Sequence, residues 1–321
     1  MDEDEWHIHP LLSAWLLGVS GMLTYVAQLR RSFEQGSVIS ESQFRVEVEY
    51  CEAKFGTKYP FDIIYQLAQA WSVVVADLIG GIGALCSEEK ITFSCLPLVR
   101  MAEEYSARIA WLLDDDATVE QRAARALLED ANGASEMAIA ATHTVGKEDA
   151  TRKHYRNRLK KSRAIVLQMF PSSVVANEPN QWSVIGETTF NEEDGPQAFE
   201  EKFQRPSATA EIFGKRWIRA GSWEGFYYYL SACVHPGIGV LEYFELDGGV
   251  ENRLRTETSL NDLHLQISVA LISHYQSMHH LVSYLGYPSE VLQEIRSGTE
   301  LFFPGLLTEL DSEPLGKDFE E

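Results

Sequence analysis

Apolar residues recur every three or four positions along most of the chain. This spacing puts them on one face of an α-helix, whereas a half-buried strand would alternate apolar and polar residues. Capping signals mark two helix starts, because Ser94 precedes Pro97 and Thr118 precedes Gln121. The sequence therefore predicts an all-α helical bundle. The expected helices cover residues 10–34, 42–54, 61–86, 95–113, 118–144, 148–170, 208–219, 223–235, 259–285 and 289–297.

Two short segments break the helical pattern. The stretch 171–206 is rich in turn-forming residues, and its run 182–190 predicts a hairpin or an edge strand. A second hairpin is expected with 247–249 as the turn between strands 243–246 and 250–254. Neither segment is large enough for a sheet-based core.

The chain is expected to form one domain. Its 321 residues, 45% hydrophobic and 11% aromatic, can bury a substantial core. We expect two helical halves, residues 1–170 and 207–303, that pack on each other. A partly β insertion at 171–206 lies between them, and an acidic tail follows at 304–321.

The charge balance limits the classes of partner. The formal net charge is −21, from 48 acidic against 27 basic side chains. Such a charge repels a phosphate backbone at long range, so extended nucleic-acid binding is a poor default, although local patches can overrule the net sign. The chain begins Met-Asp-Glu-Asp-Glu, which is the wrong charge for a secretory signal and predicts a cytoplasmic address.

Two apolar stretches, 11–29 and 63–86, are long enough to raise the question of a membrane. Both have the moderate hydrophobicity of buried helices in a large bundle, and we expect them to be buried rather than membrane-spanning. Because together they present more apolar surface than one bundle face needs, we also predict a homodimer in which one of them forms the interface.

Metal and cofactor chemistry finds little support. The cysteines, Cys51, Cys86, Cys95 and Cys233, lack the short paired spacing of zinc or redox sites, so buried reduced thiols are expected. No two of the histidines crowded into 264–280 stand four residues apart, and Asp114-Asp115-Asp116 is typical of a solvated turn between helices. We expect neither a metal ion nor a cofactor.

Two polar rows on core helices form the candidate site. Tyr227, Ser231 and His235 stand at four-residue intervals, as do Arg100, Glu104 and Arg108, so each set lines one face of its helix. Polar groups within a core must find partners, so the two rows are expected to face each other or a shared cleft.

Two interpretations of the rows stay open. In the functional one, His235 acts as a general acid or base, Ser231 orients a ligand, and Arg100 holds an anionic group. In the structural one, His235 caps its helix, Ser231 bonds to the preceding turn, and Arg100 pairs with Glu104. No acidic residue is placed to complete a Ser-His-Asp triad.

A basic run stands out in this acidic chain. Seven of the 27 basic residues fall within 152–163, where a helix would show positive charge on most faces. This charge suits phosphates, a partner's acidic surface or the chain's own acidic segment 191–201. Neutralisation within the protein or a homo-oligomer is the favoured interpretation, ahead of nucleic acid. The seven are Arg152, Lys153, Arg156, Arg158, Lys160, Lys161 and Arg163.

Short motifs carry a resemblance to known proteins. An Arg-x-x-x-Glu helix ends in Trp111-Leu-Leu-Asp114, the Arg122-Ala-Ala-Arg125 helix follows, and Tyr227-x-x-Leu-Ser231-x-x-x-His235 comes later. This arrangement resembles a group of uncharacterised all-helical proteins common in actinobacteria, which are themselves similar to the HEPN superfamily. The resemblance implies an intracellular, often dimeric helical bundle in a superfamily that includes metal-independent ribonucleases of toxin and antiviral systems.

Two functions are therefore expected. The first is a binding or interaction protein whose polar cleft takes a small anionic ligand or a protein partner. The alternative is a metal-independent ribonuclease or toxin-type enzyme of a defence system, with His235 as the acid or base and Arg100 or Arg108 stabilising the developing charge. Catalytic HEPN proteins carry an Arg shortly before a His on one helix, and no His of this chain follows an Arg in that way. This departure favours the binding function.

Overall fold

The computed structural model describes residues 42–87, 95–147, 149–190, 244–246, 254–256, 260–287, 289–304 and 306–307, together with residues 17, 18 and 21. This part of the chain contains seven long helices, which confirms the all-α prediction. They are α2 (Gln43–Phe55), α3 (Tyr59–Ser87), α4 (Cys95–Leu112), α5 (Val119–Thr144), α6 (Ala150–Met169), α10 (Leu260–Leu285) and α11 (Glu290–Phe302). The expected helices at 208–219 and 223–235 lie outside the described residues, as does most of 10–34.

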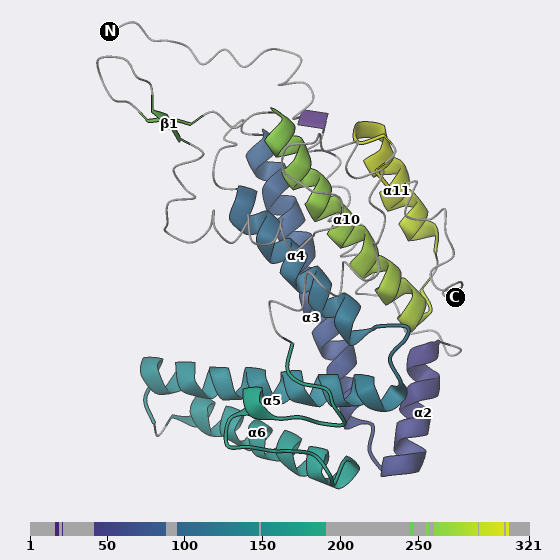
Figure 1. Cartoon of the computed structure of the whole chain (residues 1–321), viewed down its shortest axis with the longest axis vertical. Helices are drawn as coiled ribbons and strands as arrows, with labels where there is room; N and C mark the ends of the chain where they lie inside the picture. The colour runs from purple at the N-terminus through teal and green to yellow at the C-terminus, as the bar shows by residue number, and fades with distance from the viewer. Residues whose placement is uncertain are drawn as a thin grey trace, which may run out of the picture.

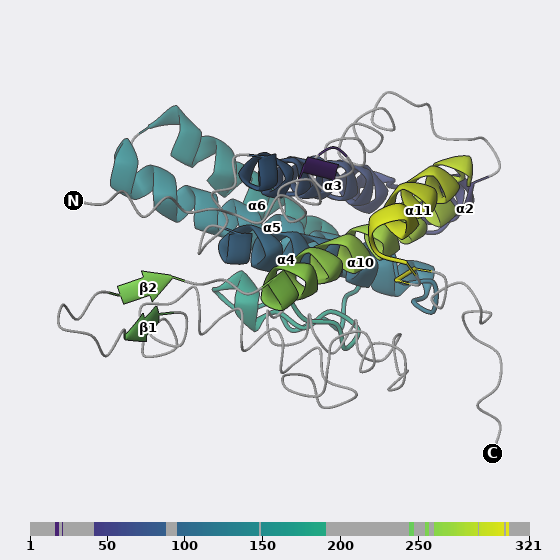
Figure 2. The ribbon, with the colours of Figure 1, turned by 90° about the horizontal axis from the view of Figure 1, so that it is seen from above.

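The helices form a bundle with a hairpin across one end (Figure 1). α3, α4 and α10 lie side by side in both views, and α11 packs on the outer side of α10 (Figures 1 and 2). The α5–α6 hairpin crosses the end of this bundle where α2 also lies. Helix α10 therefore completes a core begun by α3 and α4, which precede it by more than a hundred residues.

Local sequence signals explain the helix ends. At the start of α2 the Ser42 side chain accepts the Arg45 N–H, and Gly56 ends the helix with a φ of +71°, a left-handed conformation that suits glycine. The capping box before α5 has both of its hydrogen bonds, between Thr118 and Gln121. These contacts are short-range, which is why the sequence predicted the helix bounds to within a few residues.

The core is built from the aliphatic faces of the three central helices. α3 buries Ile64 and Ile82, α4 buries Leu112, and α10 buries Ile267, each with no exposed surface. Burying one such aliphatic side chain contributes roughly 1.5–3 kcal/mol. Among the described residues, Tyr59–Cys86 is the one helix long and apolar enough to cross a membrane, and half of its most apolar stretch is buried in the protein.

The three described cysteines are buried and free of disulfides, as the sequence predicted. Burial raises the pKa of Cys51 and of Cys95 to about 11, and that of Cys86 to about 12. Their thiols are therefore protonated at neutral pH and are poor nucleophiles and metal ligands. Cys233 lies outside the described residues.

The run 182–190 forms a tight hairpin, one of the two forms expected. Val184 and Glu187 exchange both backbone hydrogen bonds at 2.9 Å across a two-residue turn. Ile185 and Gly186 have φ angles of +48° and +91°, as a type I′ turn requires. The buried Trp182 anchors the hairpin by donating its indole N–H to the Ala176 carbonyl.

The second hairpin differs from its predicted register. β1 (Phe244–Leu246) pairs antiparallel with β2 (Leu254–Thr256), and Leu246 stands opposite Leu254. Residues 247–253, which include the predicted turn at 247–249, separate these paired positions. The prediction placed the turn at the Asp-Gly-Gly signal, whereas strand pairing decides the register.

Candidate functional site

Half of the predicted cleft can be placed in the structure. Arg100, Glu104 and Arg108 lie on α4, in the middle of the bundle. Tyr227, Ser231 and His235 lie outside the described residues. That the two rows face each other therefore stays a prediction, and the geometry of the α4 row is considered by itself.

Arg108 joins three parts of the chain. Its guanidinium donates to Glu104 Oε1 at 3.3 Å, one turn earlier on α4, and to Glu129 Oε2 on α5 at 3.0 Å. The ring of Phe190 lies 4.7 Å from the guanidinium carbon. The Phe190 N–H also donates to Glu129 Oε1 at 3.1 Å, so the insertion is tied to the same carboxylate. Such a shared ion pair has a structural role that needs no ligand.

Arg122 makes the most deeply buried ion pair of the described residues. Its guanidinium donates from Nε to Glu47 Oε2 at 3.1 Å and from Nη2 to Glu47 Oε1. The Tyr284 hydroxyl donates to the same carboxylate at 2.8 Å. This cluster joins α2, α5 and α10, and burial raises the pKa of Tyr284 well above its usual value.

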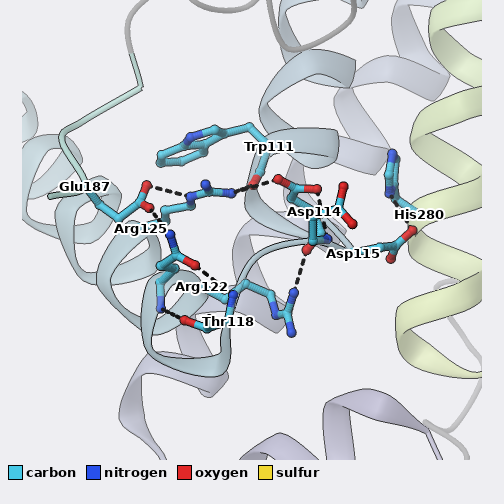
Figure 3. A network of polar contacts seen from close by, with 10 residues as sticks. Trp111, Asp114, Asp115, Thr118, Arg122, Arg125, Glu187 and His280 are labelled. Atoms are coloured by element: carbon cyan, nitrogen blue, oxygen red, sulfur yellow. Dashed lines mark hydrogen bonds and ion pairs between the residues drawn. The ribbon is translucent and has the colours of Figure 1, made fainter. Parts of the chain in front are cut away.

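Arg125, one turn further along α5, fastens the type I′ hairpin (Figure 3). Its Nε donates to Glu187 Oε2 at 2.8 Å, and its Nη1 donates to the Trp111 carbonyl at 2.6 Å. The guanidinium also stacks over the Trp111 ring, 5.2 Å from its centroid. Trp111, Arg122 and Arg125 thus hold elements of the fold together.

The Asp114-Asp115-Asp116 run closes the turn between α4 and α5, as predicted. The Asp116 N–H donates to Asp114 Oδ1 at 3.2 Å, and the Asp114 carbonyl accepts from Arg122 Nη1. Asp115 Oδ2 lies 3.8 Å from His280 Nδ1 on α10 (Figure 3). Within the described part of the chain, no three acidic, His or Cys side chains are grouped as metal ligands.

A buried carboxyl group on α4 escaped the sequence prediction. Glu103 is 2% exposed, and neither carboxyl oxygen has a hydrogen-bond partner in the part of the chain that the structure describes. Burial raises its pKa to about 8, nearby Arg100 lowers the pKa and Glu104 raises it. Glu103 is therefore mostly protonated at neutral pH. The sequence offered one signal for this buried carboxyl group, namely a Glu at an apolar position of the helical pattern.

The basic run forms most of α6, and its charges are sorted between two sides of the helix. Arg158 donates to the fully buried carboxylate of Asp130, which also accepts from the Tyr59 hydroxyl at 3.0 Å. The Lys161 ammonium lies 3.7 Å from the centroid of the Tyr59 ring. These two cations contact groups on neighbouring helices, although Lys161 stays exposed.

The other five cations form a stripe on the outer side of α6. With 3.6 residues per turn, their positions fall within a sector of about 100°. Arg152 and Arg163 donate to the backbone carbonyls of Lys147 and Val175, and neither forms an ion pair with a carboxylate of the described residues. We call this set the α6 stripe. It consists of Arg152, Lys153, Arg156, Lys160 and Arg163.

Sequence reasoning missed the carboxylates that hold these arginines. Glu47, Glu129, Asp130 and Glu187 come from distant parts of the chain, and no spacing pattern links them to their partners. Comparison with known proteins adds no further candidate, because no family model, no curated protein and no solved structure matches the chain.

Proposed function

We propose that this protein is an intracellular interaction protein and that the exposed side of α6 binds an anionic partner. The distribution of charge partners supports the proposal. Arg108, Arg122 and Arg125 each bind a carboxylate within the protein. By contrast, Arg156 and Lys160 are exposed and form no ion pair with any described residue. Cations left in this state are available to a partner.

The stripe is unusual because the rest of the chain carries a strong negative charge. α6 holds seven of the 27 basic residues and no acidic residue, so 20 basic residues remain elsewhere against 48 acidic ones. An isolated positive face on an acidic protein guides an anionic partner to one orientation, because all other approaches are repelled. Specificity of docking, rather than high affinity, is the expected result.

We propose the predicted polar cleft as a second binding site. A small anionic ligand near Arg100 would use the row on α4 together with Tyr227, Ser231 and His235. We also propose that the protein is a cytoplasmic homodimer. Among the described residues, Arg108 is paired with Glu104 and Glu129. This structural role supports a binding function for the cleft over a catalytic one.

Retention on immobilised heparin tests the proposal with a simple polyanion. We expect the full-length protein to be retained at low salt despite its negative net charge. The double substitution Arg156→Gln/Lys160→Gln is expected to abolish retention, since it removes two exposed cations that have no ion pair among the described residues. The matched control is Arg45→Gln/Lys58→Gln, which changes the net charge equally at two exposed residues outside α6. A wild-type protein that flows through, or a control that loses retention to the same extent, would contradict the proposal.

A further inference from the structure

The α6 stripe continues into an apolar position along the same line. Lys153, Arg156, Lys160, Arg163 and Leu167 are separated by three, four, three and four residues. This alternation is the spacing of a helix-packing seam, and it spans about 21 Å at 1.5 Å per residue. The stripe is therefore a straight track of cations with a leucine at its C-terminal end.

The apolar end of the track is exposed to solvent. Leu167 is 44% exposed, and Val174 in the following segment is 63% exposed. The Arg163 guanidinium donates to the carbonyl of the adjacent Val175 at 3.4 Å, which brings this segment to the end of the stripe. A partner that covers Leu167 and Val174 would remove apolar surface from water as well as neutralise the cations.

These features favour a protein partner over a nucleic acid. A surface that binds single-stranded nucleic acid combines cations with exposed aromatic rings on which bases stack. No position of the seam is aromatic, and its one uncharged member is a leucine. The net charge of −21 also opposes a long phosphate backbone more strongly than it opposes a short acidic segment.

We propose that the α6 stripe binds an acidic amphipathic protein segment that lies along the helix. Carboxylates spaced three and four residues apart on the partner pair with Arg156, Lys160 and Arg163. An apolar side chain one turn beyond them covers Leu167. This inference rests on the proposed function and names the partner class of the same surface.

A designed peptide tests the inference with the full-length protein. The probe is a fluorescent helical peptide that carries Glu at three-and-four spacing followed by Leu, and its scrambled version has the same composition. We expect fluorescence anisotropy to show tighter binding of the ordered peptide. Arg156→Glu/Lys160→Glu should weaken binding by about tenfold or more, since exposed ion pairs become repulsive contacts. Leu167→Ala should weaken binding of the ordered peptide and leave the scrambled one unchanged.

The controls separate this inference from the proposed function. Arg45→Gln/Lys58→Gln should bind the ordered peptide as the wild type does, and far-ultraviolet circular dichroism should show that each variant keeps its helices. A single-stranded oligonucleotide of equal charge that binds more tightly than the ordered peptide would overturn the inference in favour of nucleic acid. Equal binding of both peptides would also overturn it, because charge alone would then suffice. If either result is found while the protein still binds heparin, the inference about a protein segment is wrong, but the proposed binding of an anionic partner by α6 is not contradicted.

Discussion

Tyr284, near the end of α10, donates its hydroxyl hydrogen to Glu47 on α2 at 2.8 Å, although the two residues are 237 positions apart. Arg122 binds the same carboxylate and lies over the Tyr284 ring, 5.6 Å from its centroid. The three residues are each at most 3% exposed. A charge pair in such a place is costly to break, because its surviving member stays buried without compensation.

Arg122→Met should therefore lower the free energy of unfolding by about 3–5 kcal/mol, since Glu47 is left as a buried unpaired charge. The double variant Glu47→Leu/Arg122→Met should lose much less than the sum of the two single substitutions. Urea unfolding followed by circular dichroism measures all three variants. Additive losses would show that the two side chains do not act as a pair.

The pKa of Glu103 predicts a pH dependence of stability. Burial raises this pKa from its ordinary 4.5 to about 8, so the folded protein holds a proton that the unfolded chain releases. Stability should then fall as pH rises through this window, by at most about 1.4 kcal/mol per pH unit from this group. Glu103→Gln should flatten the fall and raise the unfolding midpoint at pH 8. Glu49→Gln, the same substitution at an exposed position, is the control. An unchanged slope in Glu103→Gln would contradict the prediction.

The type I′ turn contains a residue poorly suited to it. Ile185 has a φ of +48°, and a β-branched side chain is strained in this left-handed region, which Asn and Gly adopt readily. Ile185→Asn creates the Asn-Gly pair that such turns favour, and it should stabilise the protein by about 1 kcal/mol. Thermal unfolding provides the measurement. Ile139→Asn, at an exposed position within α5, should instead be slightly destabilising because Asn is a weaker helix former.

The homodimer is testable by sedimentation. At micromolar concentration we expect a dimer whose interface uses residues 11–29 or 63–86. Ala70→Glu places a charge on the exposed side of α3 and should dissociate the dimer if α3 forms the interface. A dimer that persists in this variant would favour 11–29, and a monomeric wild-type protein would contradict the prediction altogether.

The binding function and the ribonuclease alternative predict opposite results with an RNA substrate. We expect the purified protein to leave a single-stranded RNA substrate intact, because the arginines that the structure pairs on α4 and α5 hold the fold together. Cleavage by the wild type that His235→Ala abolishes, without a change in helical content, would establish the alternative instead. Gel analysis of the products decides between them.

The sequence alone predicted the features that depend on neighbouring residues. The capping box of Thr118 and Gln121 and the hairpin within 182–190 act over a few positions, so their residues determine them locally. The same reasoning identified Arg100, Glu104 and Arg108 as a row on one helix face and the basic run as a distinct surface.

Tertiary structure decided which partners those residues meet. Of seven similar cations in α6, Arg158 binds Asp130 and Lys161 lies over the Tyr59 ring, whereas the other five lie on the stripe. Likewise, no local pattern chooses Glu47 for Arg122 among 48 acidic residues. Residue types and spacing determine the helices and the faces they carry, whereas the packing of distant helices determines which charges are neutralised and which remain for a partner.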